Sequence, residues 1–280
     1  MWPIDDWPLM GEQWRRAEEM GFETAWIYDH LAWRGHRPWD EAYASLAAAA
    51  ALTTHMRLGT LVSTPNFRQP LPTAAAARTV DRISQGRLTL GLGAGGSDHT
   101  SDGDVLGHAW SPRERASRFE EWVEHLDLLL TQSPTTAAGE HFSAVDVTVA
   151  DGLVQRRPPF YVAGNGPRGM ALAVRFGHAW IANPTTPGAG AYEEVRATVR
   201  RLEEVGAPAG RNVTSMPKLL LTGFTGEPWV ESVDAFDDLA GRYAEIGITD
   251  VAIHWPRPGT EWACDWDVFE AIAERAGATP

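Results

Sequence analysis

Apolar residues recur along the chain with two alternating periods, one typical of helices and one typical of short buried strands. In the first segment, Trp14 and Ala17 lie on one face of a helix predicted over Met10–Met20, and charged residues occupy the opposite face. Gly21 ends this helix, and the apolar run Thr24–Tyr28 follows as a predicted buried strand. A helix followed by a strand is therefore the unit whose repetition the pattern predicts.

The same alternation continues to the carboxyl end and predicts eight helices and seven strands in all. The further helices are predicted at Glu41–His55, Thr73–Gln85, Pro112–Thr131, Arg168–Phe176, Tyr192–Val205, Val230–Ile246 and Trp266–Arg275. The further strands are predicted at Arg57–Ser63, Arg87–Leu92, Pro159–Ala163, Ala179–Ala182, Lys218–Gly223 and Asp250–Trp255, with a hairpin or excursion at Gly139–Val149. Strands that alternate with helices pair in parallel through right-handed crossovers. The pattern predicts the α/β class and a single domain over residues 1–280, a (β/α)8 TIM barrel.

A closed barrel of this kind needs eight strands, whereas the predicted series begins with a helix. The segment Met1–Leu9 contains Pro3 and Pro8 and is too short and too interrupted to supply a good strand. We therefore expect either a barrel whose first strand is missing or truncated, or a native start that lies upstream.

Composition narrows the class of protein. The 280 residues carry 37 Asp+Glu against 24 Lys+Arg, a formal net charge of −13, which argues against a nucleic-acid or anionic-membrane surface. No apolar run approaches the roughly 20 residues of a membrane span, and the first residues lack a signal-peptide pattern. The single Cys264 excludes an internal disulfide and a Cys-based zinc cluster, and the nine histidines show no metal-ligand spacing. We expect a soluble cytoplasmic protein without a metal site.

In a parallel α/β barrel the active site lies where the strands end and the loops begin. Asp29 and His30 directly follow the first predicted strand, and Trp33 comes soon after. Histidine at this edge suits a proton donor or a hydrogen-bonding wall for a ring, because its charge changes near neutral pH. The alternative is that the carboxylate and the imidazole only satisfy backbone groups of the loop.

Glycine-rich turns follow two other predicted strands. Gly91–Gly96 satisfies the G-x-G-x-x-G pattern literally, but the polar segment Ser97–Asp104 has poor helix propensity, so we do not predict Rossmann-type dinucleotide binding. These glycines would instead let a flat ring or a ribityl chain lie against the backbone. Gly164–Gly169 ends a strand and opens a helix, so its N–H groups, the helix dipole and Arg168 would bind an anion. A tight turn without a ligand is the alternative.

The loop after the second predicted strand and several tryptophans complete the candidate site. Gly59 inside that strand indicates either close approach of a ligand or a backbone irregularity. Arg68 of the loop would pair with a ligand or with an acidic neighbour. Aromatic side chains near strand ends could wall an apolar pocket. The residues that we assign to this pocket are Trp33, Trp110 and Trp255, together with Asn66 of the loop. Trp39 also lies near a strand end.

Several of these stretches, taken together, resemble the bacterial-luciferase-like family. They are Arg57–Val62 with Phe67, Arg68 and Pro70, then Asp81–Gly95, the helix carrying Arg113, Arg115, Arg118, Phe119 and Glu120, Gly164–Gly169, and Gly177–Trp180. The match runs from about Trp14 to Trp180. The resemblance implies a barrel that binds FMN or coenzyme F420, an 8-hydroxy-5-deazaflavin. It also implies oxidation or reduction of a small organic substrate, in some members as a two-component monooxygenase fed by a separate reductase.

The resemblance also assigns roles to individual residues. It places Asp29 and His30 near the reactive edge of the ring, as the catalytic pair, and a non-prolyl cis peptide at Leu61–Val62. It assigns cofactor binding to Thr60, Leu61, Val62, Gly93, Ala94, Gly95, Gly164, Asn165 and Gly166, the last three as the phosphate turn. Gly96 stands where some deazaflavin-dependent dehydrogenases carry a glutamate acid, which argues against a sugar-phosphate dehydrogenase of that kind.

The sequence therefore predicts an oxidoreductase or monooxygenase that uses FMN or F420 on a small organic molecule. Its expected partners are that substrate, a separate flavin or F420 reductase and a second copy of the chain in a homodimer. A non-catalytic flavin-binding subunit of the same fold is one alternative. A barrel lyase or isomerase acting on a phosphorylated metabolite is another, although Lys218, the one lysine, stands at a strand start, which makes Schiff-base chemistry a poor fit.

Overall fold

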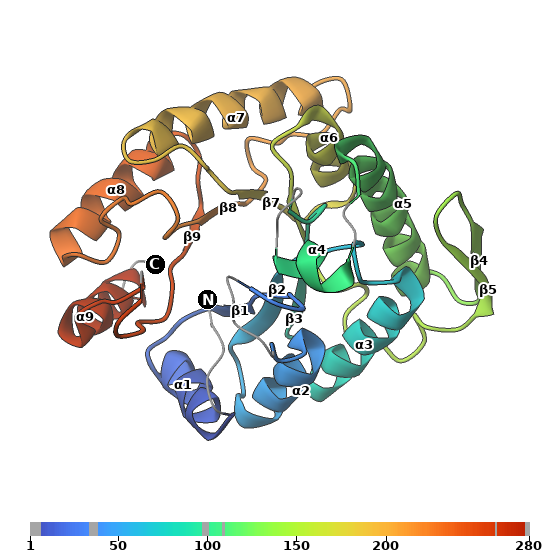
Figure 1. The fold of residues 1–280 in the computed structure, drawn as a ribbon, viewed down its shortest axis with the longest axis horizontal. Helices are drawn as coiled ribbons and strands as arrows, with labels where there is room; N and C mark the ends of the chain where they lie inside the picture. The colour runs from blue at the N-terminus through green and yellow to red at the C-terminus, as the bar shows by residue number, and fades with distance from the viewer. Residues whose placement is uncertain (1–6, 34–38, 97–100, 108–109, 261, 278–280) are drawn as a thin grey trace.

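Seven parallel strands curl into an open barrel with the helices on its outside (Figure 1). The computed structural model describes residues 7–33, 39–96, 101–107, 110–260 and 262–277. The strands follow the chain in the order β1-β2-β3-β6-β7-β8-β9 and every neighbouring pair is parallel. They are β1 Thr24–Ile27, β2 Arg57–Ser63, β3 Leu88–Leu92, β6 Phe160–Ala163, β7 Ala179–Ala182, β8 Lys218–Leu221 and β9 Asp250–Ala252. The alternation predicted from the sequence is confirmed, and the order without a reversal excludes a doubly wound Rossmann sheet.

Helices connect the strands and cover the outer face of the sheet. They are α1 Trp7–Glu19, α2 Ala42–Leu52, α3 Pro70–Ile83, α4 Ser101–Leu106, α5 Pro112–Thr131, α6 Pro167–Phe176, α7 Gly190–Gly206, α8 Val233–Glu245 and α9 Trp266–Gly277. Local chemistry sets several ends: the Ser111 hydroxyl accepts from the N–H of Glu114 at the start of α5, and Gly21 after α1 has a φ of 83°. Among the described residues, no helix combines the length and the apolar character that crossing a membrane requires.

The helix boundaries depart from the sequence prediction by up to three residues; α2, for example, ends at Leu52 instead of His55, and α8 begins at Val233 instead of Val230. α1 begins at Trp7 and α3 at Pro70, three residues before the predicted starts in each case, because proline fits the first turn of a helix. The polar segment predicted to be non-helical contains the short helix α4, whose first turn carries Asp102 and Asp104. Residues 97–100 of that segment lie outside the described residues. The predicted hairpin is present as β4 Thr135–Ala138 and β5 Ser143–Val147, which pair antiparallel.

Side chains alternate between two cores, one inside the barrel and one between the sheet and the helices. In β1, Trp26 belongs to the inner cluster, whereas Ala25 and Ile27 belong to the outer one. In β8, Leu219 is inside and Leu220 outside. This period of two is the ordinary geometry of a strand, and it decides which residues near the strand ends can reach the barrel mouth.

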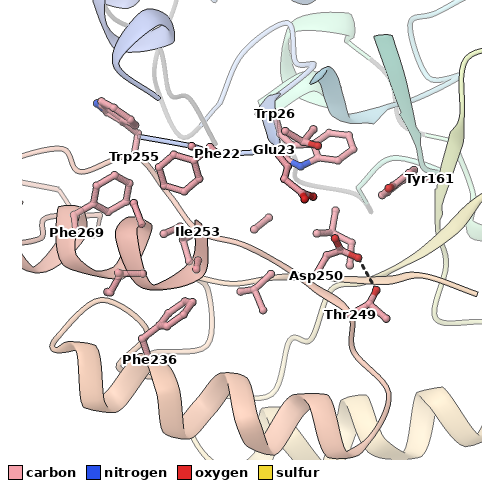
Figure 2. A pocket seen from close by; sticks show the side chains of 18 residues that line it. Phe22, Glu23, Trp26, Tyr161, Phe236, Thr249, Asp250, Ile253, Trp255 and Phe269 are labelled. Atoms are coloured by element: carbon pink, nitrogen blue, oxygen red, sulfur yellow. Dashed lines mark hydrogen bonds between the residues drawn. The ribbon is translucent and has the colours of Figure 1, made fainter. Parts of the chain in front are cut away.

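The barrel is open between its two edge strands, β1 and β9. α1 and α9 lie on either side of this opening (Figure 1). A cavity of about 450 Å³ fills it, lined by Phe22 and Trp26 on the β1 side, by Ile253 and Trp255 on the β9 side and by Phe269 of α9 (Figure 2). The seven strands of the described chain therefore leave room where a closed barrel has an eighth. Residues 1–6, part of the segment predicted to be too short for that strand, lie outside the described residues.

Candidate active site

His30 lies just after the carboxyl end of β1 and is partly buried. Its Nδ1 is 2.6 Å from Oδ2 of Asp102 on α4. The indole of Trp33 stacks on the imidazole, with ring centroids 4.6 Å apart and planes inclined by 24°. Trp39 meets the same ring edge-on at 5.9 Å. The structure thus holds His30, with Trp33 beside it, at the sheet edge where parallel barrels carry their chemistry.

Asp29, the second residue predicted to be catalytic, has a fully buried side chain. Arg68 donates to its two carboxylate oxygens from Nε at 2.9 Å and from Nη2 at 2.6 Å, and the Ser63 hydroxyl donates at 2.5 Å. Burial raises the pKa of the Asp29 carboxyl, and the bonds from Arg68 and Ser63 oppose that rise. Arg68 also pairs with Glu41, so it binds acidic neighbours. Asp29 therefore joins the loops that follow β1 and β2.

The loops after β2 and β3 approach so closely that side chains do not fit between them. The peptide bond between Leu61 and Val62 is cis, as the resemblance implies. A Cβ atom on Gly93 would lie 2.5 Å from a methyl carbon of Val62, and one on Gly95 would lie 2.2 Å from the amide nitrogen of Asn66. Gly95 also has a φ of 79°. Glycine keeps this floor of bare backbone, which fits the predicted seat of a flat ring.

Other predicted cofactor-binding positions in these strands are internal. Thr60 is fully buried, and its hydroxyl donates to the carbonyl oxygen of Gly91 at 3.1 Å, which supports the β2–β3 pairing. Gly59 leaves space for the indole of Trp26, because a Cβ there would lie 2.5 Å from a ring carbon. The irregularity suspected at Gly59 is thus a packing requirement inside the barrel. Ala94 is half-buried beside Gly93 and Gly95, at the floor itself.

The turn after β6 has the form expected of an anion site. Gly164 and Gly169 lie back to back, and a Cβ on Gly164 would be 2.7 Å from the Cα of Gly169. Gly166 is the N-cap of α6, makes no side-chain cap hydrogen bond and has open space around the position of a Cβ. The first N–H groups of α6 therefore lack a side-chain acceptor at the cap, and a phosphate oxygen is their natural partner.

Two side chains of this turn are engaged elsewhere, contrary to the simplest form of the prediction. Arg168 forms an exposed ion pair with Glu120 on α5, so its guanidinium is shared with that carboxylate. The amide nitrogen of Asn165 donates to the carbonyl oxygen of Asn183 at 3.1 Å. The groups of the turn that remain for the predicted anion are therefore those of its backbone.

An aromatic wall, of which the sequence predicted Trp33 alone, is formed by side chains that follow β1, β8 and β9. Tyr28 forms a 2.5 Å hydrogen bond with Nε2 of His254, which joins the two edges of the open barrel. His254 stacks on Trp262 with ring centroids 4.8 Å apart, and Tyr28 stacks on Trp33 at 6.1 Å. Phe224 meets Tyr28 edge-on. Strand alternation was the available signal, because Tyr28 shares the inward parity of Trp26, and His254 that of Ala252.

Of the tryptophans predicted to line the substrate pocket, Trp255 faces α9, and Trp110 packs on Arg118, a side chain that reaches the loop after β2. Trp255 has the outward parity and packs edge-on against Trp266 and Phe269, with ring centroids 5.3 and 5.4 Å away, so it faces α9. Trp110 packs against the guanidinium of Arg118, which lies 4.3 Å from its ring centroid. Among the described residues, no group of three or more His, Cys, Asp or Glu side chains could hold a metal ion.

Comparisons with known proteins agree with this fold. The sequence profile of luciferase-like monooxygenases matches residues 5–225. The F420-dependent glucose-6-phosphate dehydrogenase of Amycolatopsis mediterranei (strain U-32) is 35% identical over 172 residues, which are 59% of this chain and 50% of that protein. The enzyme of the same name from Beutenbergia cavernae is 35% identical over 214 residues, 73% of this chain and 60% of that protein. The matches thus span half to three-fifths of these relatives.

A solved structure shares the whole fold. An F420-dependent secondary alcohol dehydrogenase in complex with an F420-acetone adduct superposes with a TM-score of 0.78, at 20% identity, over 96% of this chain and 96% of that one. At this identity the likeness concerns the fold alone.

Proposed function

Because this chain belongs to the family of luciferase-like monooxygenases, we propose that it is an oxidoreductase that transfers hydride between coenzyme F420 and a small organic substrate. The position of His30 carries the proposal: a histidine held by Asp102 and Trp33 stands at the carboxyl edge of the sheet, where Val62 of the neighbouring strand β2 and the glycines after β3 also lie. The names of the curated relatives support F420 over FMN.

The residues present fit such a cofactor at two places. The backbone at Gly93 and Gly95, where neither residue adds a side chain of its own beside Val62 and Asn66, would receive the flat ring system. The start of α6 at Gly166 would bind the phosphate through its N–H groups. When bound, the deazaflavin supplies a ring carbon that accepts or donates hydride.

His30 would manage the proton that accompanies the hydride. Oxidation of an alcohol releases the hydroxyl proton as the carbonyl forms, and a neutral imidazole nitrogen accepts it. In the reverse direction the imidazolium returns this proton to the carbonyl oxygen. Trp33 and Tyr28 would keep water away from the reacting carbon, since their rings stack beside His30.

The substrate that we propose is a neutral secondary alcohol or the corresponding ketone. Gly96 stands where the family resemblance places a glutamate acid in some sugar-phosphate dehydrogenases. Lys218, the one lysine of the chain, is buried at the start of β8 and donates to backbone carbonyl groups, so it is not available to a phosphate at the barrel mouth. The aromatic wall of Tyr28, Trp33, Phe224, His254 and Trp262 suits an apolar molecule.

Cofactor titration tests the proposal first. Purified protein is titrated with F420 and, separately, with FMN, and quenching of its tryptophan fluorescence is followed. We expect tight binding of F420, then F420-dependent turnover within a panel of secondary alcohols, ketones and glucose 6-phosphate. Binding of FMN alone with consumption of dioxygen would replace hydride transfer by monooxygenation. Tight F420 binding without turnover of any substrate would favour a non-catalytic cofactor-binding subunit.

A matched pair of histidine variants tests the residue role. His30→Ala should lower turnover by at least about 100-fold, the usual contribution of a general acid or base, and leave the F420 affinity nearly unchanged. His55→Ala is the control, because the side chain of His55 is 71% exposed at the turn before β2, the opposite end of the sheet. Equal turnover of both variants would remove His30 from the mechanism.

We also propose that residues 1–280 form one domain, that the protein acts as a homodimer, and that a separate reductase can supply the reduced cofactor. The chemistry supports the last point, because reduced F420 must be regenerated when the protein works in the direction of ketone reduction. Light scattering of the purified protein would report the mass of the particle. A monomer would exclude the dimer.

A further inference from the structure

We propose that Asp102 is a positioning residue that holds His30 as the Nδ1–H tautomer and so leaves Nε2 as the proton acceptor of the site. The inference rests on the proposed function only for its catalytic consequence. The tautomer itself follows from the contacts of one carboxylate and can be measured without a substrate.

Asp102 reaches His30 from a distant part of the sequence. It lies in the first turn of α4, 72 residues beyond His30, and its side chain is 10% exposed. Oδ2 is 2.6 Å from Nδ1 of His30. Oδ1 accepts the backbone N–H of Leu31 at 2.7 Å and that of Ala32 at 3.2 Å. One carboxylate thus binds the imidazole and the two residues that follow it.

The hydrogen-bonding groups around Asp102 determine which atom donates in its contact with His30. A backbone N–H can only donate, so both bonds at Oδ1 are accepted by the carboxylate. An ionised carboxylate offers only acceptors, so Nδ1 of His30 must carry the proton in the contact with Oδ2. The other ring nitrogen, Nε2, is then unprotonated whenever His30 is neutral. Isolated histidine prefers the opposite tautomer, so Asp102 selects the less common form.

Two rings keep the imidazole in this orientation. Trp33 stacks on one face at 4.6 Å, and Trp39 makes a perpendicular contact at 5.9 Å with planes inclined by 88°. A flip of the His30 ring would bring a carbon where Nδ1 now contacts Asp102 and would leave that oxygen without this donor. The geometry is that of a histidine base oriented by a carboxylate, in which the carboxylate also stabilises the imidazolium that forms.

Asparagine at position 102 is the decisive substitution. In Asp102→Asn, the N–H groups of Leu31 and Ala32 still require an acceptor, so the amide oxygen must stay on their side. The amide NH2 group then faces Nδ1 of His30, which can only accept from it. The proton of neutral His30 moves to Nε2, and the site loses its proton acceptor while its shape is kept. Asp104→Asn is the matched control, because Asp104 is exposed on the same helix.

The experiment records the nitrogen chemical shifts of the His30 ring in the full-length protein, with the His30→Ala spectrum used to identify its signals. We expect protonation at Nδ1 in the unmodified protein and in Asp104→Asn, and at Nε2 in Asp102→Asn. With an accepted alcohol and F420, kcat of Asp102→Asn should fall by about 10³-fold or more, as a wrong tautomer costs serine proteases, while KM and F420 affinity stay within about threefold.

Protonation at Nε2 in the unmodified protein overturns the proposal, and this result does not depend on whether any variant folds. A folded Asp102→Asn protein that keeps both the Nδ1–H tautomer and its kcat also overturns it. Absence of turnover in every protein, including the unmodified one, counts against the proposed function. In that case the tautomer measurement still decides the role of Asp102.

Discussion

Replacing Arg68 should reveal whether Asp29 is a structural carboxylate or a participant in the chemistry. The Asp29 side chain is 0% exposed and that of Arg68 is 18% exposed, so the pair is largely removed from water. The substitution Arg68→Met keeps the apolar stem of the side chain and removes both charge-assisted hydrogen bonds to Asp29, at 2.9 and 2.6 Å. Of its hydrogen-bond partners among the described residues, the buried carboxylate then keeps the hydroxyl of Ser63.

The expected loss in the free energy of unfolding is about 3–5 kcal/mol, the cost of leaving one member of a buried ion pair without its partner. In a chain of this length that loss corresponds to a fall in Tm of roughly 6–20 °C. Glu41 contributes little to the loss, because its side chain is 50% exposed and loses only a surface ion pair. The double variant Asp29→Asn with Arg68→Met should be more stable than Arg68→Met alone, since it buries no charge.

Urea denaturation followed by tryptophan fluorescence measures these differences. The pH dependence provides an internal check on their cause. Removal of Arg68 raises the pKa of Asp29 further, so the folded state binds a proton more readily than the unfolded chain. The stability deficit of Arg68→Met should therefore shrink as the pH falls from 7 towards about 4. A loss below about 1 kcal/mol, or strict additivity in the double variant, would refute this account of the pair. Asp29→Asn should keep most of its turnover per folded molecule if Asp29 takes no part in proton transfer.

Three further substitutions test other parts of the structure. Burial by itself would raise the pKa of Glu18, but hydrogen bonds from three backbone N–H groups of the turn before β2 outweigh burial and lower the pKa to about 2. Glu18 therefore stabilises the fold above about pH 4, and this contribution disappears as the pH falls towards 2. Glu18→Gln should cost about 1–2 kcal/mol at pH 7 and flatten the acid side of the stability profile in urea titrations. Gly93→Ala should weaken F420 binding at least about tenfold in fluorescence titrations, because its Cβ would displace Val62, whereas Gly241→Ala, which meets no atom within 4 Å, should bind normally. Tyr28→Phe removes the hydrogen bond between the two edges of the barrel and should lower the unfolding free energy by about 1–2 kcal/mol, and an unchanged value would mean that this bond does not join the edges energetically.

The sequence by itself determined the order of the elements, because that order depends on local patterns. Apolar spacing distinguished helix from strand, and the turn glycine Gly21 marked the end of the first helix. The seven strands in parallel order follow from the strict alternation. The sequence also identified Gly93, Gly95 and the turn before α6, because glycine is the residue type that leaves the backbone without a side chain.

Contacts between distant residues were beyond the reach of such patterns. Nothing local indicates that Asp102 meets His30, or that Arg68 serves Asp29, because each pair forms only when loops after different strands converge at one edge of the sheet. Trp255 was predicted to line the pocket because it lies near a strand end. Side chains alternate between the two faces of a strand, however, and this alternation places Trp255 on the outer face, towards α9.

The tertiary structure therefore decided which of two residues adjacent in sequence is buried in a structural role and which lies at the candidate site. Asp29 and His30 are adjacent, yet the fold buries the first against Arg68 and holds the second beside Trp33 at the sheet edge. His254 and Trp255 are divided in the same way between the barrel mouth and the helix layer. Residue type limits what each side chain can do. Burial and partners, which arise only when the sheet curls and its loops converge, decide what each one does.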